Sequence, residues 1–284
     1  MQEIDQPAWH HPTGKIASSL PALHFVHGNS FPTGTYSVFL RQLQSHYQIR
    51  ALEMHGHDPA FAVTDNWPQL CLELIASIEA APVHPAILVG HSLGGMLSLM
   101  VARMRPDLVR CVVMLDSPVV DGWRAMVLHA AKLLRIDALV PPAKNSIKRR
   151  KSWANTEEAY QHFASKPAFA IWPEPVLRDY IRFGTEPYSK GVTLRFKRDI
   201  ETAIYRTMPH VLRRFTRLPF PVPIGFICGT HSWECGKAGQ VYTQKLVGGN
   251  FEWIAGGHLY PLESPELAAQ KTHGMIEKLL RAAT

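Results

Sequence analysis

The residues of this chain that most clearly suggest chemistry are a serine and its two flanking glycines, in the pentapeptide Gly90-His91-Ser92-Leu93-Gly94. An apolar run at residues 85–89 precedes this motif, and an apolar segment with helical spacing follows it over residues 93–104. At such a strand-to-helix turn a serine points outward on a strained backbone, and glycines avoid collisions across the turn. The N-terminal end of the following helix favours negative charge. Ser92 is therefore a candidate nucleophile for attack on a carbonyl group.

A nucleophile of this kind needs two backbone donors for the oxyanion that forms on the carbonyl. The first is the N–H of the residue after the serine, here Leu93, and the second comes from a loop after an earlier strand. Residues 23–26 predict a short apolar strand, and His27-Gly28-Asn29 follows it. We therefore expect the N–H groups of Leu93 and Asn29 to form an oxyanion hole.

The candidate general base is a histidine near the C-terminal end of the chain. Gly256-Gly257-His258 follows the strand-like residues 251–254 and precedes a Pro-Glu pair that can open the last helix. A histidine on a flexible glycine loop can reach a serine and accept its proton. This order of elements singles out His258 among the 15 histidines of the chain.

The elements that must position these residues alternate between strands and helices. Further strands are expected at residues 48–52, 86–90, 111–115 and 223–228. The pattern predicts an α/β fold with a mostly parallel central sheet flanked by helices. Ligands of such sheets lie at the carboxyl ends of the strands, which is where the candidate site residues stand.

Taken together, these motifs resemble the α/β-hydrolase fold superfamily over nearly the whole chain. The resemblance rests on motifs that occur in the family's order: His27-Gly28-Asn29, Glu53-Met54-His55-Gly56-His57, Gly90-His91-Ser92-Leu93-Gly94-Gly95 and Gly257-His258-Leu259-Tyr260-Pro261-Leu262-Glu263. It implies a serine hydrolase and leaves the substrate open.

The third member of the catalytic triad departs from the family's pattern. After the strand at 223–228 the family usually shows Gly-x-x-Asp, whereas this chain has Gly229-Thr230-His231-Ser232. A catalytic histidine needs a partner on its second nitrogen. Asp116, at the end of the strand at 111–115, and Glu234 are the candidates. A Ser-His dyad and an inactive protein are the other interpretations.

Between Asp116 and Val222 lies a segment of helical pattern with several prolines. The resemblance implies that it forms a cap domain over the serine, so we predict a core of residues 1–118 and 219–284 and a helical cap of residues 119–218. Most aromatic residues of the cap are expected to pack its core, and some could line an apolar acyl pocket.

Composition agrees with a cytoplasmic enzyme. Residues 1–7 have neither a basic start nor an apolar stretch, so no signal peptide is expected. The four cysteines show no metal-type spacing and are expected to be buried free thiols. The net charge is +7, with a basic run at residues 148–151. A solvated face is the usual explanation for such a run, and attraction of an anionic substrate or an acidic membrane surface is the alternative.

These observations predict a serine hydrolase that needs no cofactor or metal and cleaves a carboxylic ester or thioester with an apolar acyl part. Ser92, His258 and Asp116 (or Glu234) would form its triad. The partner is a small-molecule substrate; nucleic acid and an integral membrane segment are not expected, and a homodimer is left open. Alternatives on the same residues are a C–C bond hydrolase, a cofactor-free perhydrolase and a non-catalytic ligand-binding homologue.

Overall fold

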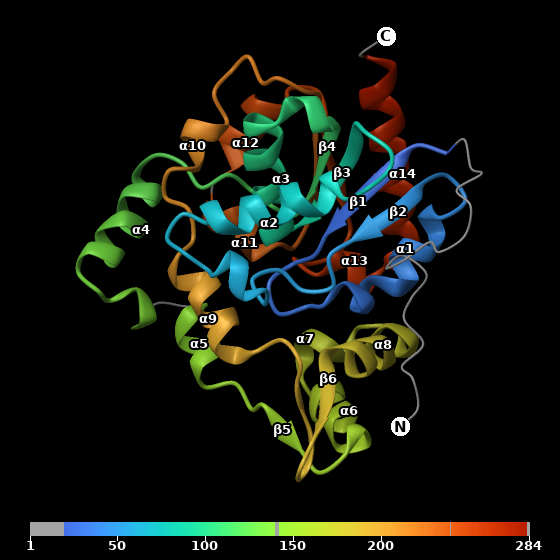
Figure 1. The fold of residues 1–284 in the computed structure, drawn as a ribbon, viewed down its shortest axis with the longest axis vertical. Helices are drawn as coiled ribbons and strands as arrows, with labels where there is room; N and C mark the ends of the chain where they lie inside the picture. Colours follow the sequence, from blue (N-terminus) through green and yellow to red (C-terminus); the bar gives the residue numbers. More distant parts are fainter. Residues whose placement is uncertain (1–19, 140–141, 239, 283–284) are drawn as a thin grey trace.

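Six parallel strands form the central sheet of the protein (Figure 1). The computed structural model describes residues 20–139, 142–238 and 240–282, so the N-terminal residues in which we expect no signal peptide lie outside it. The strands lie in the order β2-β1-β3-β4-β8-β9, and each neighbouring pair is parallel. Their bounds are β1 Ala22–Val26, β2 Gln48–Ala51, β3 Ala86–His91, β4 Val109–Leu115, β8 Ile224–Gly229 and β9 Phe251–Ile254. The predicted α/β fold is confirmed.

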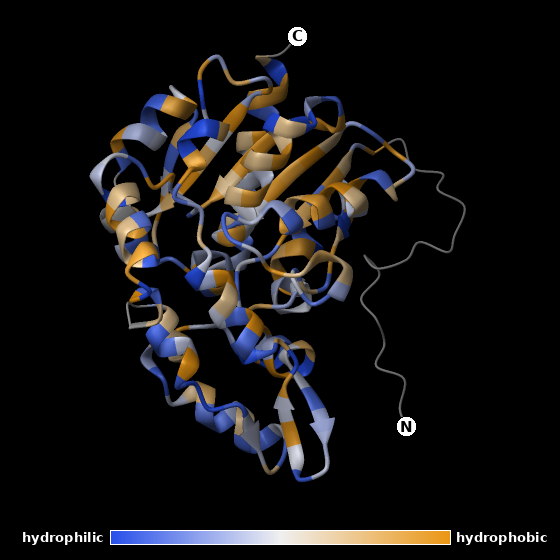
Figure 2. Ribbon diagram, turned by 60° about the vertical axis from the view of Figure 1, so that its left-hand side comes forward, coloured by the Kyte–Doolittle hydropathy of each residue, from blue (hydrophilic) through white to orange (hydrophobic). Residues whose placement is uncertain are grey.

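Helices cover both faces of this sheet and bury two apolar cores. Successive residues of β3 point to opposite faces: Ile87 and Val89 belong to one core, and Leu88 to the other. Because both faces are buried, the inner strands β1, β3, β4 and β8 are mostly apolar, and such strands appear orange in Figure 2. The edge strands β2 and β9 are less buried and contain polar residues. The first core includes α1 (Ser37–Leu43) and α14 (Pro265–Arg281), and the second includes α2 (Pro68–Glu79), α3 (Leu93–Met104) and α12 (Gln240–Val247).

Short elements join these strands and helices. They are η1 Thr33–Tyr36, η2 Pro59–Phe61, η3 Pro106–Leu108, α11 Trp233–Ala238 and α13 Tyr260–Glu263. None of the helices in the described ranges is both long enough and apolar enough to cross a membrane. The four cysteines are buried and free, as the sequence predicts.

The segment between β4 and β8 contains helices and a second, three-stranded sheet. Its elements are α4 Trp123–Leu133, η4 Asp137–Leu139, α5 Ala143–Ile147, β5 Ser152–Trp153, α6 Thr156–Ala164, α7 Pro167–Ala170, α8 Glu174–Gly184, β6 Thr185–Tyr188, β7 Gly191–Leu194, α9 Arg198–Arg206 and α10 Leu212–Phe215. Most of these elements are helices, as the sequence pattern predicts, and the antiparallel strands in the order β5-β7-β6 are an addition that it did not predict. Gly191 makes this sheet possible, because its φ is +129° and a Cβ there would lie 2.2 Å from the carbonyl oxygen of Trp153.

Aromatic packing joins this segment to the loop that follows β1. The ring of Phe31, two residues after Asn29, lies 5.9 Å from the ring of Trp172 and 5.7 Å from that of Tyr180. Phe163, Trp172 and Tyr180 are buried, in accord with the expected packing role, whereas Trp123 is exposed. In Figure 1 the elements from α5 to α9 lie together below the sheet.

Candidate active site

Ser92 occupies a strained turn between β3 and α3. Its φ of 53° and ψ of −114° lie in a region that residues with side chains rarely adopt. The turn is held by the Ser92 N–H, which donates to the carbonyl of Leu115 at 3.0 Å. A Cβ on Gly90 would lie 2.3 Å from the backbone of Gly94, and a Cβ on Gly94 would lie 1.9 Å from the Val26 carbonyl oxygen. Both glycines are therefore required by close backbone approach.

Three side chains from distant parts of the chain form a continuous hydrogen-bonded row at this turn. His258 Nε2 lies 2.9 Å from Ser92 Oγ, and His258 Nδ1 lies 2.6 Å from Asp116 Oδ2. Ser92 follows β3, Asp116 follows β4 and His258 follows β9. Because the carboxyl ends of parallel strands meet at one edge, residues up to 166 positions apart become neighbours.

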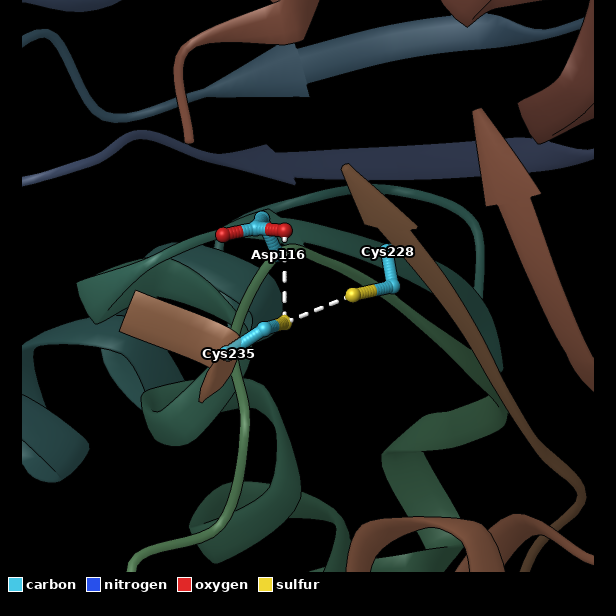
Figure 3. Close-up of side chains that lie close together, drawn as sticks. All are labelled: Asp116, Cys228 and Cys235. Carbon is cyan, nitrogen blue, oxygen red and sulfur yellow. Dashed lines mark hydrogen bonds between the residues drawn. The ribbon is translucent and has the colours of Figure 1, made fainter. Parts of the chain in front are cut away.

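The Asp116 carboxylate is fully buried and surrounded by donors. The Gly229 N–H donates to Oδ1 at 2.8 Å, and the Ser232 hydroxyl donates to Oδ2 at 2.5 Å. Cys235 Sγ lies 3.4 Å from Oδ1 and 2.8 Å from Cys228 Sγ, as Figure 3 shows. A carboxylate fixed by so many donors keeps one orientation toward His258. Ser232, at the position where the family usually carries the acid, thus bonds the aspartate that contacts the histidine.

Glu234 lies at the edge of this arrangement. Its Oε2 is 3.9 Å from His258 Nδ1, beyond hydrogen-bond distance, and its side chain is 46% exposed. Asp116 is 0% exposed and lies in direct contact with the same nitrogen. Of the two carboxylates considered from the sequence, Asp116 therefore has the geometry of a partner for His258, and Glu234 adds negative charge nearby.

Burial and the mutual contact of His258 and Asp116 oppose one another in setting their pKa values. Burial favours the neutral form of His258, but the hydrogen bond and charge of Asp116 outweigh it and raise the histidine's pKa above its ordinary value. Burial likewise disfavours the Asp116 carboxylate, but donation from His258, Ser232 and Gly229 outweighs this effect and lowers its pKa. The pair therefore favours an ionised aspartate that stabilises an imidazolium.

Leu93 and Asn29 both lie beside the turn. Leu93 is the first residue of α3, so its N–H is at the end of the helix where donors have no helical partner. Asn29 is buried, and its side-chain amide donates to the Glu201 carbonyl oxygen at 3.1 Å. The neighbouring Ser30 hydroxyl donates to the Glu201 carboxylate at 2.5 Å. Glu201 of α9 thus fixes the loop that carries Asn29, a contact that the sequence pattern did not predict.

Tyr36 and His91 link this loop to the turn and to the histidine loop. The Gly28 N–H donates to Tyr36 Oη at 3.2 Å, and Tyr36 Oη lies 2.7 Å from His91 Nδ1. His91 Nε2 in turn lies 2.9 Å from the carbonyl oxygen of His258. Burial lowers the pKa of His91 to about 3, so its ring is neutral and donates from Nε2 while Nδ1 accepts from the phenol. Sequence reasoning missed Tyr36, because no spacing rule connects it to His91.

A buried carboxylate also holds the loop after β2. Glu73 Oε2 lies 3.0 Å from His55 Nδ1 and accepts from the Gly56 N–H at 2.9 Å. The His55 N–H donates to His27 Nε2 at 2.8 Å. The sequence motif at residues 53–57 therefore has a structural role, bracing the loop that leads to Asn29.

Two sets of side chains in the described ranges could hold a metal ion. They are Asp116 with Cys228 and Cys235, and Asp116 with Glu234 and His258, and the ligand atoms of each set lie within 4.8 Å of one another. Both sets contain Asp116, and a cation there would compete with His258 for its carboxylate.

The signature of the alpha/beta hydrolase family matches residues 25–271. This chain belongs to the alpha/beta hydrolase family. The match includes Asn29, Ser92, Asp116 and His258, so the resemblance carried by the sequence motifs is confirmed.

Similar proteins with curated names include ester hydrolases. The pimeloyl-[acyl-carrier protein] methyl ester esterase of Xanthomonas campestris pv. campestris is 34% identical over 97 residues, which are 34% of this chain and 37% of that protein. The protein of the same name from Methylococcus capsulatus is 34% identical over 123 residues, 40% of this chain and 45% of that protein. The matches thus span less than half of these relatives' length.

Solved structures resemble this chain over most of its length. E-2-(Acetamidomethylene)succinate hydrolase has a TM-score of 0.74 at 21% identity and covers 92% of both chains. The thioesterase domain from the curacin biosynthetic pathway has a TM-score of 0.68 at 16% identity, covering 89% of this chain and 90% of that one. At these identities the likeness concerns the fold.

Proposed function

We propose that this protein is a serine hydrolase that cleaves a carboxylic ester or thioester with an apolar acyl part through an acyl-enzyme. The observation that carries the proposal is the row Ser92 Oγ, His258 Nε2, His258 Nδ1 and Asp116 Oδ2, with successive contacts of 2.9 and 2.6 Å. The names of the curated relatives support ester hydrolysis in general.

In the proposed reaction His258 takes the proton of Ser92 Oγ as this oxygen attacks the substrate carbonyl. The resulting oxyanion accepts hydrogen bonds from the N–H groups of Leu93 and Asn29. Asp116 keeps the Nδ1–H tautomer of His258 and stabilises the imidazolium. His258 then protonates the leaving alcohol or thiol and activates a water molecule that releases the acid and restores Ser92.

We also propose that residues 119–218 act as a cap over this site, with residues 1–118 and 219–284 as the core. The packing of Phe31 against Trp172 and Tyr180 supports this division, because it joins the inserted segment to the loop that carries Asn29. A cytoplasmic location is part of the proposal and is supported by the four free thiols.

The test is hydrolysis of p-nitrophenyl esters of increasing acyl length by the wild type and by purified, folded Ser92→Ala. Ser165→Ala, on an exposed part of the inserted segment, is the matched control. We expect turnover by the wild type and by the control and none above background by Ser92→Ala. Equal turnover by Ser92→Ala would refute the serine mechanism. Ligand binding without turnover by the wild type would favour the non-catalytic homologue.

A further inference from the structure

A groove of about 580 Å³ lies on the inserted segment beside the loop that carries Asn29. Ser30 and Phe31 of this loop form one side of it, and Lys148 and Lys166 lie on the side of the inserted segment. Ser30 directly follows Asn29, so consecutive residues connect the groove to the proposed oxyanion hole. Figure 1 shows α5 and α9, which border the groove, side by side.

The groove carries positive charge that the protein itself does not neutralise. Arg149 pairs with Glu201 at 3.0 Å, and Arg150 pairs with a glutamate of α6 at 2.5 Å. Among the residues that the structure describes, no carboxylate lies within 4.0 Å of the ammonium groups of Lys148 and Lys166. The basic run at residues 148–151 is therefore divided: its two arginines are paired, and Lys148 faces the groove without a counter-charge.

The surroundings of Lys166 show the same excess of positive charge. Burial lowers the pKa of Lys166, and the charge of Arg149 lowers it further. The ammonium lies 5.3 Å from the ring centroid of Phe163, a weaker compensation than a carboxylate would offer. Phe163 and Phe169 line the same groove and supply an apolar wall. An elongated ligand with an apolar chain and a negative end would satisfy both features.

We propose that this groove binds an anionic group, a carboxylate or a phosphate, of the substrate at a distance from the bond that is cleaved. Lys148 and Lys166 are its specificity-determining residues. The inference rests on the proposed ester hydrolysis and adds to it a class of substrate: an ester or thioester whose acyl or alcohol part ends in a negative charge.

The test compares monomethyl esters of linear dicarboxylic acids with the corresponding neutral dimethyl esters, over increasing chain length. The variant is the double substitution Lys148→Gln and Lys166→Gln, which removes charge and keeps polarity. Lys144→Gln is the matched control, because Lys144 is an exposed lysine of α5 that does not line the groove. Binding of the free dicarboxylate and of inorganic phosphate is measured separately by isothermal titration calorimetry.

We expect the wild type to prefer the monoester at one chain length. The double variant should lose about tenfold in kcat/KM for it, which equals about 1.4 kcal/mol and lies within what two exposed charge interactions contribute. Activity on the neutral diester should stay unchanged in both variants. Phosphate binding that requires the two lysines, without a monoester preference, would also support the proposal and identify phosphate as the group recognised.

Equal kcat/KM for monoester and diester, with no lysine-dependent binding of either anion, would overturn the proposal and leave ester hydrolysis intact. If no ester is turned over, the calorimetric comparison alone decides the inference. In that case the proposed function fails. The proposed anion site then stands only if binding of the dicarboxylate or of phosphate disappears in the double variant and persists in Lys144→Gln.

Discussion

The substitution Asp116→Asn tests which carboxylate serves His258. The aspartate accepts from the N–H of Gly229, the hydroxyl of Ser232 and Nδ1 of His258, and its Oδ1 also lies 3.4 Å from the thiol of Cys235. An amide has a single acceptor oxygen, so its NH₂ must face one of these donors. If it faces His258, the ring proton moves to Nε2, and the ring cannot accept the proton of Ser92. Such a reversed tautomer costs a factor of roughly 10⁴ in kcat, or about 5.4 kcal/mol.

Glu234→Gln is the matched control, because it removes a carboxylate of the same site at 3.9 Å instead of 2.6 Å from His258 Nδ1. We expect its kcat to stay within about threefold of the wild type, since exposed charges are well screened by water. The assay is p-nitrophenyl ester hydrolysis under saturating substrate, with circular dichroism to verify folding. A large loss in Glu234→Gln and a loss below tenfold in Asp116→Asn would refute the assignment.

The position of Ser232 offers a rescue of the same defect. Its hydroxyl lies 2.5 Å from the Asp116 oxygen that contacts His258, so a side chain at 232 points toward the histidine. We expect Ser232→Asp, introduced into Asp116→Asn, to restore kcat by roughly tenfold or more, because it places a carboxylate where the family usually has one. No recovery of kcat in a folded double variant would show that a carboxylate at position 232 cannot replace that of Asp116 as the partner of His258.

Three further outcomes follow from the site. Only the neutral ring of His258 acts as a base, and Asp116 raises the pKa of this ring, so the acid limb of kcat/KM against pH should have its midpoint above 6.5. In Asp116→Asn the acid limb of the residual activity should move to lower pH. Tyr36→Phe should lower kcat/KM about tenfold and also lower the melting temperature, because it leaves the buried Gly28 N–H without an acceptor and His91 Nδ1 without a donor. Gly94→Ala should lower the free energy of unfolding by about 3 kcal/mol in a urea titration, since the new Cβ meets backbone at 1.9 Å.

The sequence predicts the sheet and the positions of Ser92 and His258 because both depend on local signals. The strands expected at 86–90 and 251–254 are observed at Ala86–His91 and Phe251–Ile254. Buried parallel strands require continuous apolar runs, and a serine at a tight turn requires flanking glycines, so each feature is visible within a few residues. The boundaries shift by only one or two residues, as hydrogen bonding at strand ends decides them.

Other features were not predictable because they depend on contacts between distant segments. The strands β5, β7 and β6 are short, and their pairing depends on Gly191, which lets its own segment of backbone come close to that of Trp153. In the sequence, Tyr36 is one of several apolar residues with helical spacing. Its hydroxyl can bond His91 only because β1 and β3 lie side by side in the sheet. Glu201 reads as one charge of a polar helix, yet it is buried against Ser30.

The sheet topology explains why the sequence motifs alone do not identify the carboxylate partner of His258. β4 and β8 are parallel neighbours, so Asp116 and residue 232 emerge at the same edge of the sheet, and either position can direct a side chain to His258. Because residue 232 is a serine in this chain, the sequence leaves Asp116 and Glu234 as the candidates for the acid. The structure adds that Asp116 has a φ of 45°, a strained conformation for an aspartate, and is held there by Gly229, Ser232 and His258. One of these buried donors loses its acceptor in Asp116→Asn, so we expect the substitution to lower the free energy of unfolding by about 1–3 kcal/mol, beside its larger effect of about 5.4 kcal/mol on kcat.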